Sequence, residues 1–115
     1  MPLLSLQTNL SVSKEQTTEL LQQFSTLLAQ ITRKPERYVL VTVRDGQAML
    51  FGGTAEPLAY LECKNIGLSS AQAKAISAAV AELLKSKLKL SPERIYIEFS
   101  NAAPEFWGWN GGTFG

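Results

Sequence analysis

The pattern of apolar and polar positions predicts two helices, each with one apolar face. Apolar side chains recur at helical spacing in two windows of the chain. The first window contains Leu20, Leu21, Phe24, Leu27, Leu28 and Ile31, and the second contains Ile76, Val80, Leu83, Leu84 and Leu88. Each window begins with a serine that has a glutamine three residues later, which is typical of a helix capping box. The two pairs are Ser13–Gln16 and Ser69–Gln72.

Strand-like runs flank both helical windows and reveal an internal repeat. Residues 3–8 and 58–63 precede the two helices, and residues 38–43 and 95–99 follow them. A Pro-Glu-Arg triplet stands before each of the later runs, at positions 35–37 and 92–94. The chain therefore repeats a strand–helix–strand unit, with one copy in about residues 1–57 and the other in about residues 58–115.

Two such units predict an α/β (α+β) fold in a single domain over residues 1–115. The four strands would form one sheet with both helices on the same face. Five residues fall on alternating strand positions and would leave the other face partly apolar and exposed: Tyr38, Leu40, Thr42, Tyr96 and Glu98. Because such faces are commonly buried against another subunit, we expect an oligomer.

Two segments lie outside the repeat. Asp45-Gly46 is a tight-turn signal, and a short run over residues 47–51 follows it and ends at Gly52-Gly53. The tail over residues 105–115 carries four aromatic side chains among glycines: Phe106, Trp107, Trp109 and Phe114. We expect this tail to dock onto a neighbouring subunit or onto the wall of a pocket, since disordered tails are seldom so aromatic.

Composition limits the partners and the catalytic groups that the chain can have. The 11 basic and 10 acidic residues give a net charge of +1 and are scattered, which argues against nucleic acid as a partner. No apolar run is long enough to span a membrane, and no signal peptide is recognisable, so we expect a cytoplasmic protein, with non-classical secretion left open.

The chain contains no histidine and only one cysteine, Cys63, which excludes His-dependent nucleophiles and disfavours a metal site. A general base would have to be a carboxylate, a lysine, a tyrosine or the chain terminus.

The sequence resembles the macrophage migration inhibitory factor (MIF) family of the tautomerase superfamily over nearly its whole length. The resemblance rests on Met1-Pro2, Lys34-Pro35, Phe51-Gly52-Gly53, Glu56-Pro57, Asn65-Ile66-Gly67, the segment 91–97 and the closing residues Gly108-Trp109-Asn110 and Thr113-Phe114. It implies a homotrimer of β-α-β-β-α-β protomers with one active site at each subunit boundary. It also implies keto–enol tautomerisation of phenylpyruvate-type 2-oxo acids, an aryl 2-oxo acid as the small-molecule partner, and no cofactor.

The same resemblance implies roles for particular residues. Pro2 would be the general base once Met1 has been removed, Lys34 would contact the substrate carboxylate, and Tyr96 would polarise the substrate oxygen from the adjacent subunit. The backbone N–H of Ile66, next to Asn65, would donate to the substrate. Glu98, Trp107, Trp109 and Phe114 complete the expected substrate-binding residues. The α-amino group suits the first role because its reference pKa of about 7.7–8.0 can be lowered by desolvation or by a nearby cation.

Each of these residues also has a structural interpretation. Pro2 could simply mark a processed terminus or begin an edge strand. Lys34 could complement the negative end of the first helix, and Tyr96 could be a packing residue at a subunit boundary. Position 98 is commonly Asn in the family but is Glu98 here; a carboxylate beside Pro2 would raise the pKa of the amine, unless Glu98 pairs with Lys34 or Arg37. The Cys-x-x-Cys segment of some members is absent, and Cys63 is expected to pack as a small buried hydrophobe.

Two other functions compete with the tautomerase. One is a MIF-like signalling or binding protein that retains a vestigial tautomerase pocket. The other is hydration or dehalogenation of unsaturated acids, which would favour several arginines converging on the pocket. Arg33, Arg37, Arg44 and Arg94 are available, but their spacing does not predict that they converge.

Overall fold

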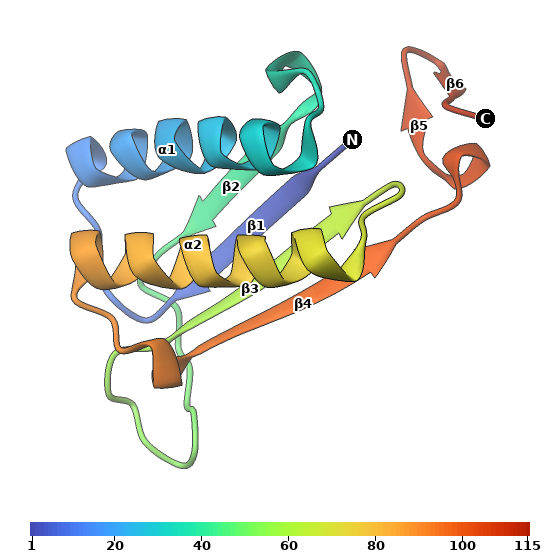
Figure 1. Cartoon of the computed structure of the whole chain (residues 1–115). Helices are drawn as coiled ribbons and strands as arrows, with labels where there is room; N and C mark the ends of the chain where they lie inside the picture. Colours follow the sequence, from blue (N-terminus) through green and yellow to red (C-terminus); the bar gives the residue numbers. More distant parts are fainter.

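The computed structural model describes all residues, 1–115, and contains two helices packed on a four-stranded sheet (Figure 1). The sheet strands are β1 (Leu3–Thr8), β2 (Leu40–Arg44), β3 (Ala59–Asn65) and β4 (Ile95–Asn101). The helices are α1 (Lys14–Thr32) and α2 (Ser70–Leu88). A short hairpin near the C-terminus consists of β5 (Gly108–Trp109) and β6 (Gly112–Thr113). The predicted strand–helix–strand repeat is confirmed.

The sheet order is β2-β1-β3-β4, with the two copies of the repeat joined at its centre. Within each copy the strands are parallel, and β1 runs antiparallel to β3 across the join. Leu3 lies opposite both Leu40 and Lys64, and Lys64 lies opposite Ser100. This register places the N-terminus of β1 beside the C-terminal ends of β3 and β4.

Both predicted capping boxes are present. The Ser13 side chain accepts a hydrogen bond from the backbone of Gln16, and Ser69 does the same with Gln72, at 3.1 Å in each case. Both helices end at a non-glycine residue in the left-handed conformation, Arg33 with φ 59° and Lys89 with φ 60°. Each helix is therefore delimited by its own local sequence.

The core lies between the sheet and one face of both helices. Leu4 and Leu6 of β1 pack with Phe24 and Leu28 of α1, and all four are fully buried. Ile76, Val80 and Leu84 of α2 complete the same cluster from the second copy. Cys63 is also fully buried within it, as predicted, and burial raises the pKa of its thiol.

The opposite face of the sheet carries no helix (Figure 1) and is partly apolar, as predicted. Leu40 and Tyr96 are exposed there to 53% and 65%, but the central strands present mainly polar side chains. These side chains are Ser5 and Gln7 of β1, and Tyr60, Glu62 and Lys64 of β3. The prediction of a partly apolar, exposed face is therefore confirmed, with the exposed apolar side chains on the edge strands and mainly polar side chains on the central ones.

Two predicted segments differ in detail. The Pro-Glu-Arg triplets contribute to 3₁₀ turns, η1 (Glu36–Tyr38) and η2 (Pro92–Arg94), so β2 begins at Leu40 and Tyr38 is not a strand residue. Proline fixes φ and favours such a turn over direct entry into a strand. The run after Asp45-Gly46 is a projecting loop whose only β contact is a bridge between Phe51 and Thr54.

Candidate active site

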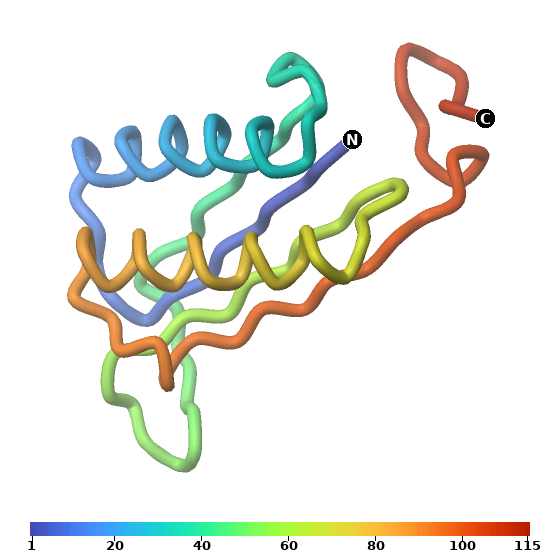
Figure 2. The backbone as a smooth tube through the Cα atoms, in the orientation of Figure 1, coloured from blue at the N-terminus to red at the C-terminus, as the bar shows by residue number.

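The C-terminal tail returns to the end of the molecule at which the N-terminus lies (Figure 2). Residues of both segments line a cleft there. The cleft has a volume of about 400 Å³ and is largely apolar. We call it the N-terminal cleft; its wall is formed by Met1, Pro2, Leu3, residues 37–40, Trp107, Gly108, Trp109 and Phe114. Pro2 is buried, and its carbonyl accepts a hydrogen bond from the Leu40 N–H at 3.0 Å. Because β1 is an inner strand, the interpretation of Pro2 as an edge-strand residue is wrong.

The aromatic tail forms one wall of this cleft. Trp109 and Phe114 stack with ring centroids 5.6 Å apart, and both meet the ring of Tyr38 edge to face. The tail folds back through η3 (Pro104–Phe106), and the Phe114 N–H donates to the Trp107 carbonyl at 3.1 Å. The predicted docking of the tail onto a pocket wall is confirmed, except for Phe106, which is 83% exposed.

Lys34 acts on the terminal amine, although its side chain is not part of the cleft wall. Burial, the charge of Lys34 and a hydrogen bond with its side chain together lower the pKa of the Met1 amine to about 6, and burial is the largest of these causes. The Lys34 ammonium donates a hydrogen bond to the carbonyl of Ile66 rather than to the last carbonyls of α1. This hydrogen bond does not test whether the charge of Lys34 also complements the negative end of α1.

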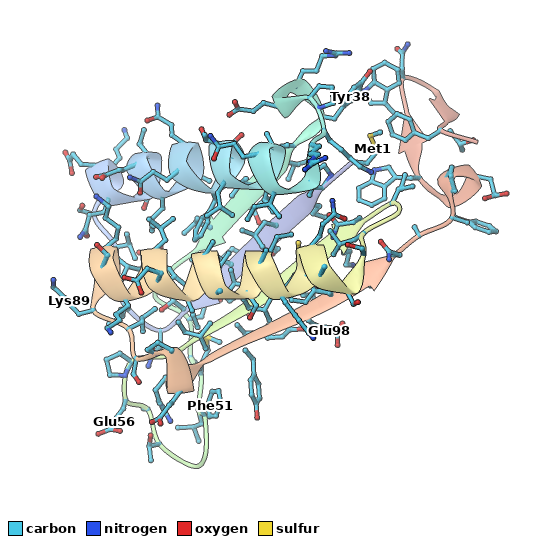
Figure 3. All side chains as sticks on the ribbon, viewed as in Figure 1. Met1, Tyr38, Phe51, Glu56, Lys89 and Glu98 are labelled. Carbon is cyan, nitrogen blue, oxygen red and sulfur yellow. The ribbon has the colours of Figure 1, made fainter.

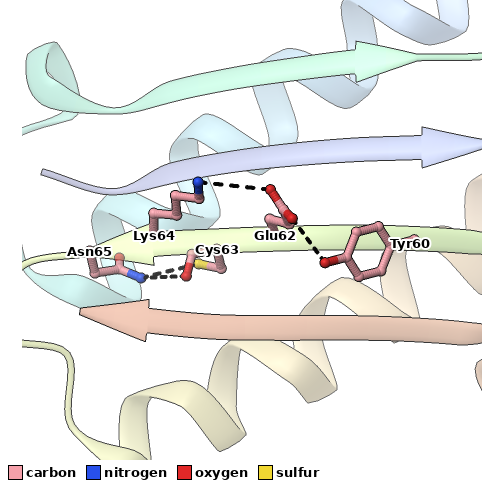
Figure 4. Close-up of polar contacts among 5 residues, drawn as sticks. All are labelled: Tyr60, Glu62, Cys63, Lys64 and Asn65. Carbon is pink, nitrogen blue, oxygen red and sulfur yellow. Dashed lines mark hydrogen bonds and ion pairs between the residues drawn. The ribbon is translucent and has the colours of Figure 1, made fainter. Parts of the chain in front are cut away.

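Ile66 and Asn65 lie just behind the cleft, at the end of β3. No hydrogen bond within the chain uses the N–H of Ile66, and Gly67 beside it has a φ of 73°. The Asn65 side chain is 2% exposed and donates to the Cys63 carbonyl at 3.2 Å (Figure 4). Asn65 does not line the cleft, because its amide is turned into the core beside Cys63. Its expected contact with substrate stays a prediction.

Tyr96 and Glu98 lie away from Pro2 within one chain. Leu3, which follows Pro2, pairs with Lys64, and Lys64 pairs with Ser100 of β4. Tyr96 lies four residues before Ser100 on the same strand. At about 3.3 Å per residue this places it about 13 Å along the sheet from the Pro2 end, and two strands across. Figure 3 shows Met1 and Tyr38 at one end of the molecule and Phe51 at the other. The ring of Tyr96 lies against that of Phe51, with the centroids 4.5 Å apart.

Glu98 belongs to a polar row on the open face of the sheet. It lies opposite Glu62, which accepts a hydrogen bond from the Tyr60 hydroxyl at 2.9 Å (Figure 4). That hydrogen bond raises the pKa of Tyr60. Glu98 forms no ion pair with Lys34 or Arg37, since the only pairs in the chain are Lys64–Glu62 and Lys87–Glu19.

Sequence reasoning missed Arg37 and Tyr38 as cleft residues. The aromatic residue following the first Pro-Glu-Arg triplet was the available signal, but it suggested a strand. The four arginines do not converge: Arg33 caps α1, Arg44 is on the sheet and Arg94 donates to carbonyls in the 51–57 loop. No cluster of acidic, cysteine or histidine residues could hold a metal ion, and neither helix is long and apolar enough to cross a membrane.

Comparisons with known proteins show the family of the chain. The family model described as "Macrophage migration inhibitory factor (MIF)" matches residues 1–115. The chain is 38% identical over 118 residues to the macrophage migration inhibitory factor of Rattus norvegicus, covering 99% of each chain. It is similar to the crystal structure of the Prochlorococcus marinus homologue, with a TM-score of 0.94 and 36% identity over 98% of this chain and 99% of that one. It is also similar to the structure of the macrophage migration inhibitory factor from Trichinella spiralis, with a TM-score of 0.87 and 32% identity over 97% of this chain and 99% of that one. The chain belongs to the macrophage migration inhibitory factor family.

Proposed function

We propose that the protein is a cofactor-independent keto–enol tautomerase of phenylpyruvate-type 2-oxo acids. The observation that carries this proposal is the chain terminus itself, which lies in an aromatic cleft where its amine has a pKa of about 6. A free amine with such a pKa is largely unprotonated at neutral pH and can accept a proton. In a chain without histidine, few other groups could do so.

The base in this proposal is Pro2, after removal of Met1. While Met1 is attached, the Pro2 nitrogen is an amide and cannot accept a proton. Removal of Met1 would convert it into a secondary amine whose ring is already buried and whose carbonyl is held by Leu40. The amine would take the enol hydroxyl proton and return a proton to carbon 3, so the atoms balance without a co-reactant.

Lys34 and Ile66 support the same reaction. The charge of Lys34 already acts on the terminal amine, and its ammonium can also attract the carboxylate of a 2-oxo acid. The unused N–H of Ile66 is available to a substrate oxygen. Trp107, Trp109 and Phe114 provide a flat apolar surface that suits an aryl group.

We propose that the active unit is a homotrimer, with each site completed by Tyr96 and Glu98 of a neighbouring copy. Within one chain Tyr96 lies toward the far end of the sheet from Pro2, and Glu98 lies midway along β4, two strands away from β1, so we assign both residues to the cleft of a second copy. Tyr96 would polarise the substrate oxygen, and Glu98 would favour the protonated form of Pro2. We also propose a cytoplasmic location.

The test is enol-to-keto conversion of phenylpyruvate by the wild type and by Pro2→Ala, after intact mass confirms that both lack Met1. Alanine keeps a free amine, so the comparison isolates the basicity and geometry of the proline ring. We expect a loss of about a hundredfold or more in kcat/KM. Pro57→Ala, at an exposed proline outside the cleft, is the matched control and should retain activity. If processed wild type shows no rate above buffer, the binding-protein interpretation replaces this one.

A further inference from the structure

The N-terminal cleft has one charged side chain on its wall, that of Arg37. The other lining residues are apolar or aromatic, apart from the terminal amine of Met1. Lys34, the cation on which the proposed function depends, lies behind the wall with its ammonium bonded to Ile66. Two separate cationic side chains therefore lie at the cleft, Arg37 on its wall and Lys34 behind it.

The charge of Arg37 is not compensated within the chain. Neither ion pair of the molecule includes Arg37, and no hydrogen bond uses its guanidinium. The adjacent carboxylate, Glu36, accepts a hydrogen bond from the Ser25 hydroxyl at 2.8 Å and so is directed toward α1. Arg37 thus retains all of its donors for an external acceptor.

Arg37 is held at the aromatic side of the cleft. Its guanidinium carbon lies 4.7 Å from the centroid of the Tyr38 ring. Tyr38 is in turn fixed edge to face by Trp109 and Phe114, with centroids 5.5 and 5.9 Å away. The contact with Tyr38 therefore places the Arg37 guanidinium beside the aromatic surface proposed for the aryl group.

We propose that Arg37 is a specificity-determining residue that selects aryl 2-oxo acids with a second carboxylate on the ring. This inference rests on the proposed function and narrows its substrate class. Lys34 takes the carboxylate next to the reacting carbon, and the planar guanidinium of Arg37 takes the distal one. A monoacid such as phenylpyruvate uses only the first cation.

Binding is measured with two unreactive probes, 3-phenylpropanoate and 3-(4-carboxyphenyl)propanoate. The chain has two tryptophans, both on the cleft wall, so their fluorescence reports occupancy directly. We expect the dicarboxylate to bind about fivefold more tightly at low ionic strength, and the difference to disappear in Arg37→Gln. Arg33→Gln is the matched control because Arg33 is exposed but does not line the cleft, and it should keep the preference.

Turnover of phenylpyruvate and of 4-carboxyphenylpyruvate separates this inference from the proposed function. We expect the ratio of the two kcat/KM values to favour the dicarboxylate and to fall about fivefold in Arg37→Gln. If both acids are converted without an Arg37-dependent ratio, this inference is wrong and the tautomerase stands. Equal binding of the two probes also overturns this inference, and the turnover assay then decides the tautomerase by itself. If neither acid is converted but the probe preference depends on Arg37, the tautomerase proposal fails and the dicarboxylate site stands.

Discussion

At the scale of single residues, the decisive feature is the environment of the chain terminus. The Met1 amine is partly desolvated in an aromatic cleft and lies near Lys34, and both conditions disfavour its protonated form. The same conditions would act on Pro2 after processing. The chemistry of this site therefore depends less on a special side chain than on where the first residues of the chain are placed.

We predict that Lys34→Gln raises the pKa of the terminal amine in chains that retain Met1. Removing the cation favours the protonated amine, so the pKa moves from about 6 toward 8.0, but only part of the way because burial is the larger cause. The measurement is the pH dependence of amine acylation by an anhydride, followed on the N-terminal peptide by mass spectrometry. Lys89→Gln, at the exposed end of α2, should leave the value at about 6. An unshifted pKa in Lys34→Gln would show that Lys34 does not act on the terminus.

At the scale of elements, one arginine organises the projecting loop between β2 and β3. Arg94 donates to the carbonyls of Phe51 at 2.7 Å, Thr54 at 3.2 Å and Glu56 at 2.9 Å, and its guanidinium lies 5.1 Å from the Phe51 ring centroid. Phe51 packs in turn on Tyr96, with centroids 4.5 Å apart. The second Pro-Glu-Arg triplet thus fixes the surroundings of the tyrosine that we place in a neighbouring site.

We predict that Arg94→Gln loosens this loop without unfolding the sheet. Losing several charge-assisted hydrogen bonds should speed backbone amide exchange over residues 51–57 about tenfold, which corresponds to roughly 1.4 kcal/mol of local stability. Hydrogen–deuterium exchange with mass spectrometry measures the effect. Arg44→Gln is the comparison because the Arg44 side chain is exposed and makes no hydrogen bond or ion pair. Equal exchange in the two variants would mean that Arg94 does not hold the loop.

At the scale of the whole molecule, the two halves of the proposed site lie at opposite ends of one chain. The cleft with Pro2 is at one end, and an apolar patch is at the other, formed by Met49, Leu50, Phe51, Leu58, Tyr60 and Tyr96. Leu50 is 70% exposed and Tyr96 is 65% exposed in the isolated chain. A head-to-tail arrangement of copies would cover this patch and complete each cleft at once.

We predict that the wild type sediments at three times its 12.6 kDa chain mass, about 38 kDa, and that Leu50→Glu lowers this mass and the tautomerase rate together. A charge in the patch would be buried without a partner on assembly, which opposes association. Analytical ultracentrifugation and the phenylpyruvate assay are run on the same samples. Ala78→Glu, on the exposed face of α2, should change neither quantity. The idea fails if the wild type is a monomer, or if Leu50→Glu stays assembled and active.

The elements themselves follow from local sequence. Helical periodicity and the two serine–glutamine caps predicted α1 and α2, and β1 was predicted with its observed bounds. These features depend on side chains within one or two turns of each other, so a single sequence contains enough information to place them. One predicted strand differs from the structure. The Pro-Glu-Arg triplets contribute to turns, and the turn at the first triplet makes β2 begin later than predicted.

What the sequence determined by itself is the repeat, its helices and strands, the family resemblance and the absence of histidine, which confines the chemistry to a few groups. Only the tertiary structure decided which residues meet. In it the aromatic tail packs on Tyr38, and the Lys34 ammonium donates to the Ile66 carbonyl. The Asn65 amide points into the core, and Arg37 is the only charged side chain on the cleft wall. Two of these contacts, Tyr38 with Trp109 and Lys34 with Ile66, join residues tens of positions apart. Their geometry depends on the register of the central strands, which is set by the pairing of segments distant in the sequence.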